Sequence, residues 1–127
     1  MASIPINLGD AFLLDTPPND KHLYIVIAKL SGSSYLFVNV TTRKLKSETA
    51  CVLLPGLGVP AFITHESVVT YRFAREIDAA GLAQLSAIRK GFCSIAVLTQ
   101  IQKGGIASRK LTNRYKNTLK TLLGTPP

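Results

Sequence analysis

Apolar positions in the first 77 residues fall into short runs rich in β-branched and aromatic side chains, separated by turn residues. This pattern predicts β-strands at 10–16, 22–30, 35–42, 50–54 and 67–75. The run at 22–30 is almost wholly apolar, which is typical of a central strand buried on both faces. In the last run, Val69, Tyr71 and Phe73 alternate with other residues, and this is the clearest period-two pattern in the chain.

The pattern changes to helical spacing after residue 77. Asp78 can cap a helix through 79–90, with Gly91 as its stop. Residues 94–102 fit helix spacing and strand composition alike, and we favour a helix. A final amphipathic helix is predicted to end at Gly124, with a cationic face opposite an apolar stripe made of Leu111, Tyr115, Leu119 and Leu122.

Close-set strands followed by helices indicate a mainly β fold: a small, strongly bent, antiparallel sheet or barrel with helices packed at one end. We expect one domain over 1–127, strand-rich at 8–76 and helical and basic at 78–123. Cys51 and Cys93 lie in apolar surroundings, which predicts buried free thiols in a reducing compartment. No apolar run approaches 18 residues and the N-terminus does not resemble an export signal, so we expect a cytoplasmic protein with no membrane span.

Positive charge is concentrated in the C-terminal third. The chain carries a formal net charge of +8, and its pI is near 9.8. Residues 1–85 hold seven Lys/Arg and seven Asp/Glu, whereas residues 86–127 hold eight Lys/Arg and no acid. Such a distribution suits RNA, DNA or an acidic protein as partner, although a helical tail kept in solution by lysines would look the same.

The candidate catalytic residues lie near the end of the predicted strand at 35–42. Glycine loops for phosphates, nucleophile elbows and metal-ligand spacings are missing from the sequence, so no metal or cofactor is expected. Thr41 and Thr42 can donate hydrogen bonds to phosphate oxygens, and Arg43 follows them. His22 starts the preceding strand, so a hairpin would place it beside Thr41. An imidazole, a hydroxyl and a guanidinium could support RNA cleavage by the 2′-hydroxyl. The alternative is an ordinary strand that leads into a solvated loop, because threonine is common in strands and arginine is common in loops.

The order of these segments resembles the PemK/MazF toxin family of bacterial toxin–antitoxin systems. The similar stretches are GDAFLLD, KHLYIVIA, FVNVTTRK and VVTYRFAR, followed by the closing basic helix. The resemblance implies an SH3-like barrel, usually a homodimer, with metal-independent endoribonuclease activity on mRNA and an acidic antitoxin as inhibitor. It places the family's catalytic threonine at Thr41, and puts His22 and Leu23 where the family has Arg-Pro. Three alternatives are compatible with His22 in place of the arginine. His22 runs a modified mechanism, Arg43 or Arg72 supplies the cation, or the chain has the fold without nuclease activity.

The predicted function is therefore a toxin-like endoribonuclease or an RNA-binding relative. The alternative is a non-enzymatic barrel that binds nucleic acid or an acidic partner. The predicted catalytic residues are His22, Thr41 and Arg43. The predicted nucleic-acid-binding residues are Thr42, Lys44, Lys46, Arg72, Arg109, Lys110 and Arg114.

Overall fold

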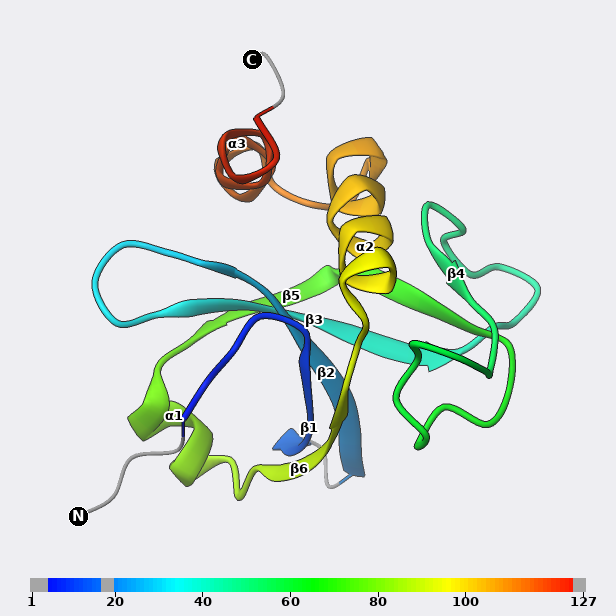
Figure 1. Cartoon of the computed structure of the whole chain (residues 1–127), viewed down its shortest axis with the longest axis horizontal. Helices are drawn as coiled ribbons and strands as arrows, with labels where there is room; N and C mark the ends of the chain where they lie inside the picture. Colours follow the sequence, from blue (N-terminus) through cyan, green and yellow to red (C-terminus); the bar gives the residue numbers. More distant parts are fainter. Residues whose placement is uncertain (1–4, 17–19, 125–127) are drawn as a thin grey trace.

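The computed structural model describes residues 5–16 and 20–124, and it has strands and helices in the order shown in Figure 1. The elements are β1 (Asp10–Thr16), β2 (Asp20–Lys29), β3 (Tyr35–Thr42), β4 (Val52–Leu53), β5 (Ser67–Ile77), α1 (Ala79–Gln84), β6 (Ile88–Phe92), α2 (Ile95–Ala107) and α3 (Asn113–Leu122).

A single curled sheet organises the described part of the chain. Its strand order is β4-β5-β3-β2-β1-β6, and each neighbouring pair is antiparallel. Strands β2 and β3 are central, which explains why both are apolar on the two faces that they present to the core. The predicted mainly β fold with C-terminal helices is confirmed, in the form of a curled half-barrel.

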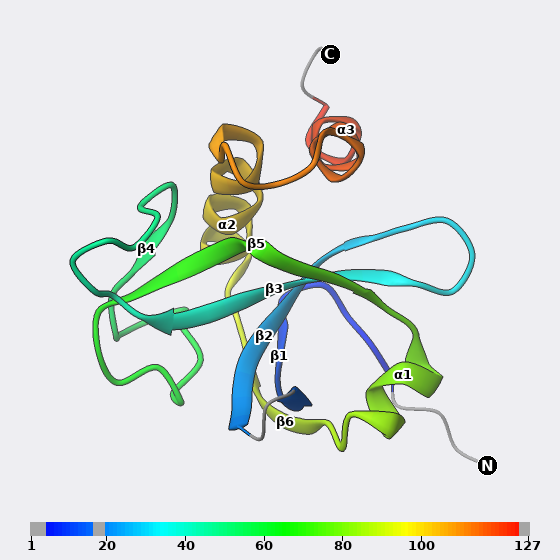
Figure 2. The same ribbon diagram turned by 180° about the vertical axis from the view of Figure 1, so that it is seen from behind.

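The sheet separates two hydrophobic clusters. Helices α2 and α3 cover one face, where Ile101 and Leu119 pack with β2, β3 and β5 residues such as Ile25 and Tyr71. On the other face, Leu82 of α1 packs into the curl of the sheet against a second cluster. Figures 1 and 2 show α2 and α3 together on one side of the sheet and α1 on the other. We call these faces the α2 face and the α1 face.

The structure between α1 and α2 differs from the prediction. The helix expected over 79–90 ends at Gln84, and residues Ile88–Phe92 form β6, which pairs with β1. Ser86 has a φ of 51°, so the backbone leaves the helix there in a left-handed conformation. The helix favoured for 94–102 is confirmed as α2, which begins at Ile95 and continues to Ala107. Ser94 is its N-cap, and its hydroxyl accepts a hydrogen bond from the Val97 amide at 3.2 Å.

Strand β5 contains a large bulge that the sequence pattern hides. Phe37 and Asn39 are two positions apart on β3, whereas their partners Arg75 and Thr70 are five positions apart on β5. The regular alternation predicted for 67–75 therefore stops after Tyr71, and Phe73 is 50% exposed instead of buried. Directly opposed residues in a sheet share a face, so the bulge brings both Thr70 and Arg75 to the α1 face.

Candidate functional site

His22 and Thr41 meet at one edge of the sheet, as the hairpin argument predicted. The register pairs Leu23 with Val40, which places His22 and Thr41 next to each other at the start of β2 and the end of β3. Both line two adjoining cavities. The first, of about 650 Å³, is the His65 cavity; its other lining residues are Lys21, Leu23, Val40, Thr42, Ala61, Phe62, Ile63, Thr64, His65 and Ser67. The second, of about 670 Å³, is the Arg75 cavity; its other lining residues are Thr16, Tyr24, Asn39, Phe73, Ala74 and Arg75.

The imidazole of His22 is held in place from β1. Its Nδ1 lies 2.6 Å from the Thr16 hydroxyl oxygen, and Thr16 is itself buried. The hydroxyl oxygen can accept from Nδ1–H whether the ring is neutral or charged, so this contact fixes the ring without fixing its protonation state. In the neutral tautomer with Nδ1–H, Nε2 carries the free lone pair. The Nε2 atom is the nitrogen that remains for a ligand.

A cation enters the site from β5, but it is Arg75 and not Arg72, the β5 residue that the sequence analysis named as a possible source. Arg75 lines its cavity together with His22 and Thr41 because the β5 bulge turns it to the α1 face. Burial raises the pKa of Tyr24, and the guanidinium of Arg75 beside it partly opposes that rise. The phenol therefore stays protonated near neutral pH, and an anion in this cavity would meet both a guanidinium and a hydroxyl donor.

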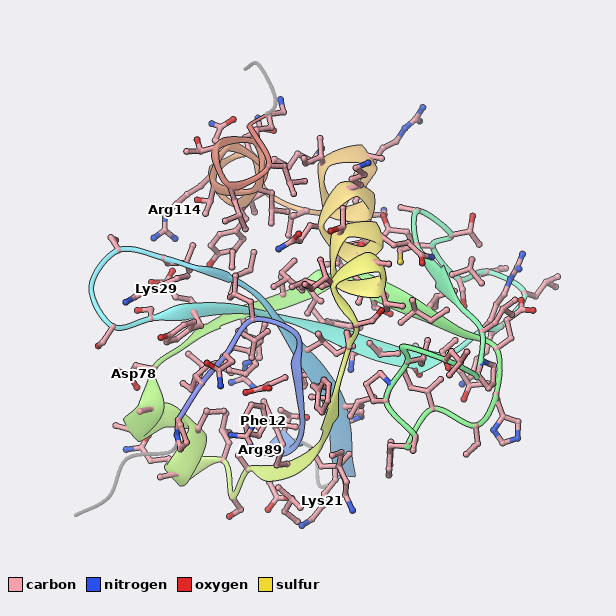
Figure 3. The ribbon with its side chains drawn as sticks, in the orientation of Figure 1. Phe12, Lys21, Lys29, Asp78, Arg89 and Arg114 are labelled. Atoms are coloured by element: carbon pink, nitrogen blue, oxygen red, sulfur yellow. The ribbon has the colours of Figure 1, made fainter. Side chains whose placement is uncertain are left out.

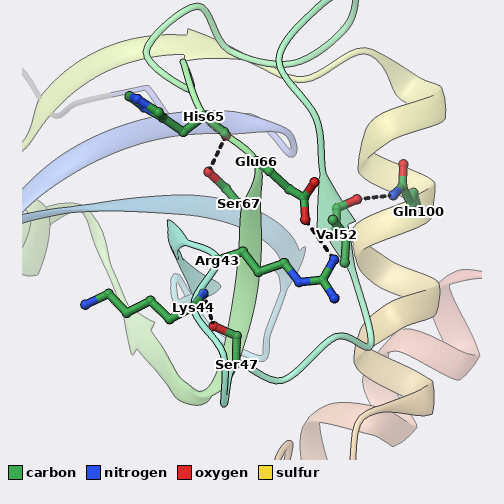
Figure 4. A network of polar contacts seen from close by, with 8 residues as sticks. All are labelled: Arg43, Lys44, Ser47, Val52, His65, Glu66, Ser67 and Gln100. Carbon is green, nitrogen blue, oxygen red and sulfur yellow. Dashed lines mark hydrogen bonds and ion pairs between the residues drawn. The ribbon is translucent and has the colours of Figure 1, made fainter.

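Arg43, which was predicted to complete the catalytic group, points elsewhere. Strand β3 ends at Thr42, and the Arg43 guanidinium pairs with the Glu66 carboxylate at 2.7 Å. Figure 4 shows Arg43 turned toward Glu66, away from the His65 ring. The structure thus brings together two of the three predicted catalytic residues and supplies Arg75 in the place expected for Arg43.

The predicted binding residues near this edge have different surroundings. Thr42 lines the His65 cavity, whereas Lys44 and Lys46 are exposed on the loop that follows β3. Arg72 is exposed on the β5 bulge, and its guanidinium carbon lies 4.7 Å from the centroid of the Phe73 ring. Lys44, Lys46 and Arg72 are not among the residues that line the two cavities.

The C-terminal basic residues are in two places: Arg114 lies at the other end of the sheet, whereas Arg109 and Lys110 follow Ser108, which bonds Glu48 on the loop between β3 and β4. Arg109 and Lys110 are exposed between α2 and α3, and Arg114 bonds Glu76 at 2.9 Å. That contact lowers the pKa of Glu76. Figure 3 shows Arg114 and Lys29 on the α3 side, near the β2–β3 turn. Because β3 is eight residues long, about 25 Å separates this turn from Thr41.

Two aromatic side chains that the sequence analysis did not predict as binding residues, Phe62 and Phe73, flank the His22–Thr41 edge. Phe62 lines the His65 cavity and is 47% exposed, with the Lys90 ammonium 5.6 Å from its ring centroid. Phe73 lines the Arg75 cavity on the other side. In the sequence, Phe62 could have been noticed because a phenylalanine beside a loop rich in glycine and proline is often exposed. Phe73 could not, because the alternating pattern of 67–75 indicates a core residue at that position.

The two thiols are buried and far from reactive. Cys51 and Cys93 are free, as predicted. Burial raises the pKa of Cys51 to about 11 and that of Cys93 to about 12, so neither is a thiolate near neutral pH. Within residues 5–16 and 20–124, no three His, Cys, Asp or Glu side chains gather as metal ligands. No helix in the same part of the chain is long and apolar enough to cross a membrane.

Solved structures with the same fold come from Deinococcus radiodurans. The chain is similar to a structure of MazE-MazF (Form-III), with a TM-score of 0.56 and 16% identity over 95% of this chain and 98% of that chain. It is similar to MazF (Form-I) with a TM-score of 0.55 and 16% identity over 94% and 97% of the two chains. No protein-family model matches the sequence, and no curated protein is a significant match. The chain has the MazF-type fold that the segment order predicted.

Proposed function

We propose that this MazF-type chain is a toxin-like endoribonuclease that cleaves single-stranded RNA at the His22–Thr41 edge. The observation that carries the proposal is the convergence of an imidazole, a hydroxyl and a guanidinium, from His22, Thr41 and Arg75, on one cavity. Each group comes from a different strand, and the sheet register sets their relative positions. A site built on strands holds its groups more precisely than a site built on loops.

In the proposed reaction, the ribose 2′-oxygen attacks the neighbouring phosphorus. Nε2 of His22 takes the 2′-hydroxyl proton, and the P–O5′ bond breaks as the new P–O2′ bond forms. The products are a 2′,3′-cyclic phosphate and a 5′-hydroxyl, which has gained a proton. The Thr41 hydroxyl and the Arg75 guanidinium donate hydrogen bonds to the non-bridging oxygens, where negative charge grows in the transition state.

The flanking aromatics suit an unpaired strand. A nucleotide whose phosphate lies at the His22–Thr41 edge has a cavity on either side, with Phe73 in one and Phe62 in the other. Bases can stack on exposed rings only when they are not already stacked within a duplex. The net charge of +8 adds a sequence-independent attraction to the RNA backbone.

The test is cleavage of a mixed-sequence, end-labelled RNA by the purified protein, with products resolved on a gel and their ends identified. We expect fragments that carry a 2′,3′-cyclic phosphate. The His22→Ala, Thr41→Ala double variant should lose at least a hundredfold in rate, because general base and oxyanion contributions each reach about 10². Arg43→Ala is the matched control: it removes an exposed cation outside the two cavities and should retain cleavage. Equal cleavage by the double variant would contradict the proposal.

We also propose a protein partner and self-association for this chain. The solved MazE-MazF structure pairs a chain of this fold with a second protein. For this basic chain we propose an acidic antitoxin-like partner, a homodimeric state and a cytoplasmic location. The cations on and beside α3, among them Lys116 and Lys120, would attract either that partner or RNA.

The second candidate is a non-enzymatic module that binds RNA at the same edge. The residue that favours it is His22, which stands where the resemblance expects an arginine and lacks a guanidinium's bidentate donors. Binding that weakens steeply with salt, without any cleaved product, would select this function over the enzyme.

A further inference from the structure

Both histidines of the chain face the same cavity, although they are far apart in sequence. His22 begins β2, and His65 lies on the loop that leads into β5. The two residues line the His65 cavity together with Thr41. Only one of them has a role in the reaction described above.

The two rings are held in the same way. Nδ1 of His22 lies 2.6 Å from the Thr16 hydroxyl oxygen, and Nδ1 of His65 lies 3.0 Å from the Thr64 hydroxyl oxygen. In each ring Nε2 is the nitrogen that remains for a ligand. When each Nδ1–H donates to its threonine hydroxyl oxygen, each ring can gain or release a proton at Nε2 without losing this contact.

The loop that carries His65 is anchored on both sides. Ile63 is buried in the α2-face cluster, and its amide bonds the Pro60 carbonyl at 2.9 Å. On the other side, the Ser67 hydroxyl donates to the His65 carbonyl at 2.8 Å, a contact drawn in Figure 4. An exposed ring on a fixed backbone can reach a bound ligand at little conformational cost.

We propose that His65 is the general acid of the RNA cleavage reaction, paired with His22 as the general base. This assignment rests on the proposed function and supplies the proton that the leaving group needs. Charged His65 gives its Nε2 proton to O5′ as the P–O5′ bond breaks, while neutral His22 takes the 2′-hydroxyl proton. The two histidines end in exchanged protonation states, and water restores them before the next turnover.

The test uses two RNA oligonucleotides with the mapped cleavage site, one natural and one with sulfur in place of the bridging O5′. Sulfur leaves readily without protonation, so it makes a general acid unnecessary. We expect His65→Ala to slow the natural substrate by about 10² or more and the sulfur substrate by only a few-fold. His22→Ala should slow both substrates to a similar extent, because the attacking hydroxyl still needs a base.

The outcomes separate the two proposals. If His65→Ala slows both substrates equally, or slows neither, the general-acid role is wrong while the endoribonuclease proposal stands. If the wild-type protein cleaves neither substrate, the endoribonuclease proposal fails and the role of His65 fails with it. Lys21→Ala is the matched cavity control: it removes a charge from the same cavity and should affect both substrates alike.

Discussion

The contact between α2 and β5 leaves no room for a side chain at Gly104. A Cβ atom added there would lie 2.5 Å from the Tyr71 hydroxyl oxygen and 2.8 Å from the Cys51 Cβ. Both neighbours are almost fully buried, and the Tyr71 hydroxyl donates to the Ile101 carbonyl at 2.6 Å. We therefore expect Gly104→Ala to be destabilising, although alanine is the better helix former.

The magnitude combines three contributions. Replacing glycine by alanine within a helix gains about 1 kcal/mol. Forcing a methyl group into this packed interface costs about 1–3 kcal/mol. Displacing the tyrosine and leaving its buried hydroxyl without an acceptor costs a further 1–3 kcal/mol or so. The free energy of unfolding should therefore fall by about 3 kcal/mol, which lowers the melting temperature by roughly 10 °C in a chain of this size.

Urea unfolding followed by circular dichroism measures this change. Lys103→Ala and Lys103→Gly, at an exposed neighbouring position in α2, isolate the helix-propensity contribution. In a Tyr71→Phe background the hydroxyl that meets the new methyl is gone, so Gly104→Ala should cost less there. A Gly104→Ala protein that is as stable as the wild type, or more stable, would refute the proposed packing of α2 against β5.

Two further predictions concern ionisation. Because Arg75 opposes the burial-induced rise in the pKa of Tyr24, Arg75→Ala should raise that pKa further; NMR titration of labelled tyrosine checks this, and an unchanged or lower pKa would contradict the placement of Arg75. The buried thiols of Cys51 and Cys93 have folded-state pKa values raised to about 11 and 12, so unfolding exposes groups that ionise at lower pH. Their stabilising contribution is present below the unfolded-state pKa, near 9, and is lost as pH rises toward 11–12, by up to a few kcal/mol. Between about pH 8 and about pH 10.5, the free energy of unfolding should fall less in a Cys51→Ala, Cys93→Ala variant than in the wild type. An equal fall in both proteins would show that the thiols do not cause the loss of stability.

Local pattern was enough to predict most of the sheet. Strands β1 and β3 occupy the predicted residues, because turn residues bound them and apolar side chains fill both central faces. The helix expected over 79–90 was too long because its apolar spacing continues past Ser86. The backbone reverses there, and residues 88–92 become a strand because they pair with the edge of β1. A tertiary contact of that kind leaves no mark on local periodicity.

The candidate site was predictable only in part. A hairpin register requires His22 and Thr41 to be neighbours, so sequence alone could pair them. Arg75 could not be found in the same way, because a regular strand would place it on the face opposite Thr70. Arg43 was misplaced for a related reason: the pattern shows where β3 ends but not that Glu66 stands beside the next residue.

The irregular stretch of β5 has a consequence for how such a chain could diversify. Strand β3 pairs with β5 on both sides of the bulge, through Tyr35–Phe37 and through Asn39–Thr42. The four β5 positions from Tyr71 to Ala74 have no paired residue on β3. Substitutions at Arg72 and Phe73 would alter which ligands the Arg75 cavity accepts, while the β3–β5 pairing would stay intact. Different residues of the same strand thus determine ligand preference and the sheet structure, and ligand preference can change in evolution while the sheet is preserved.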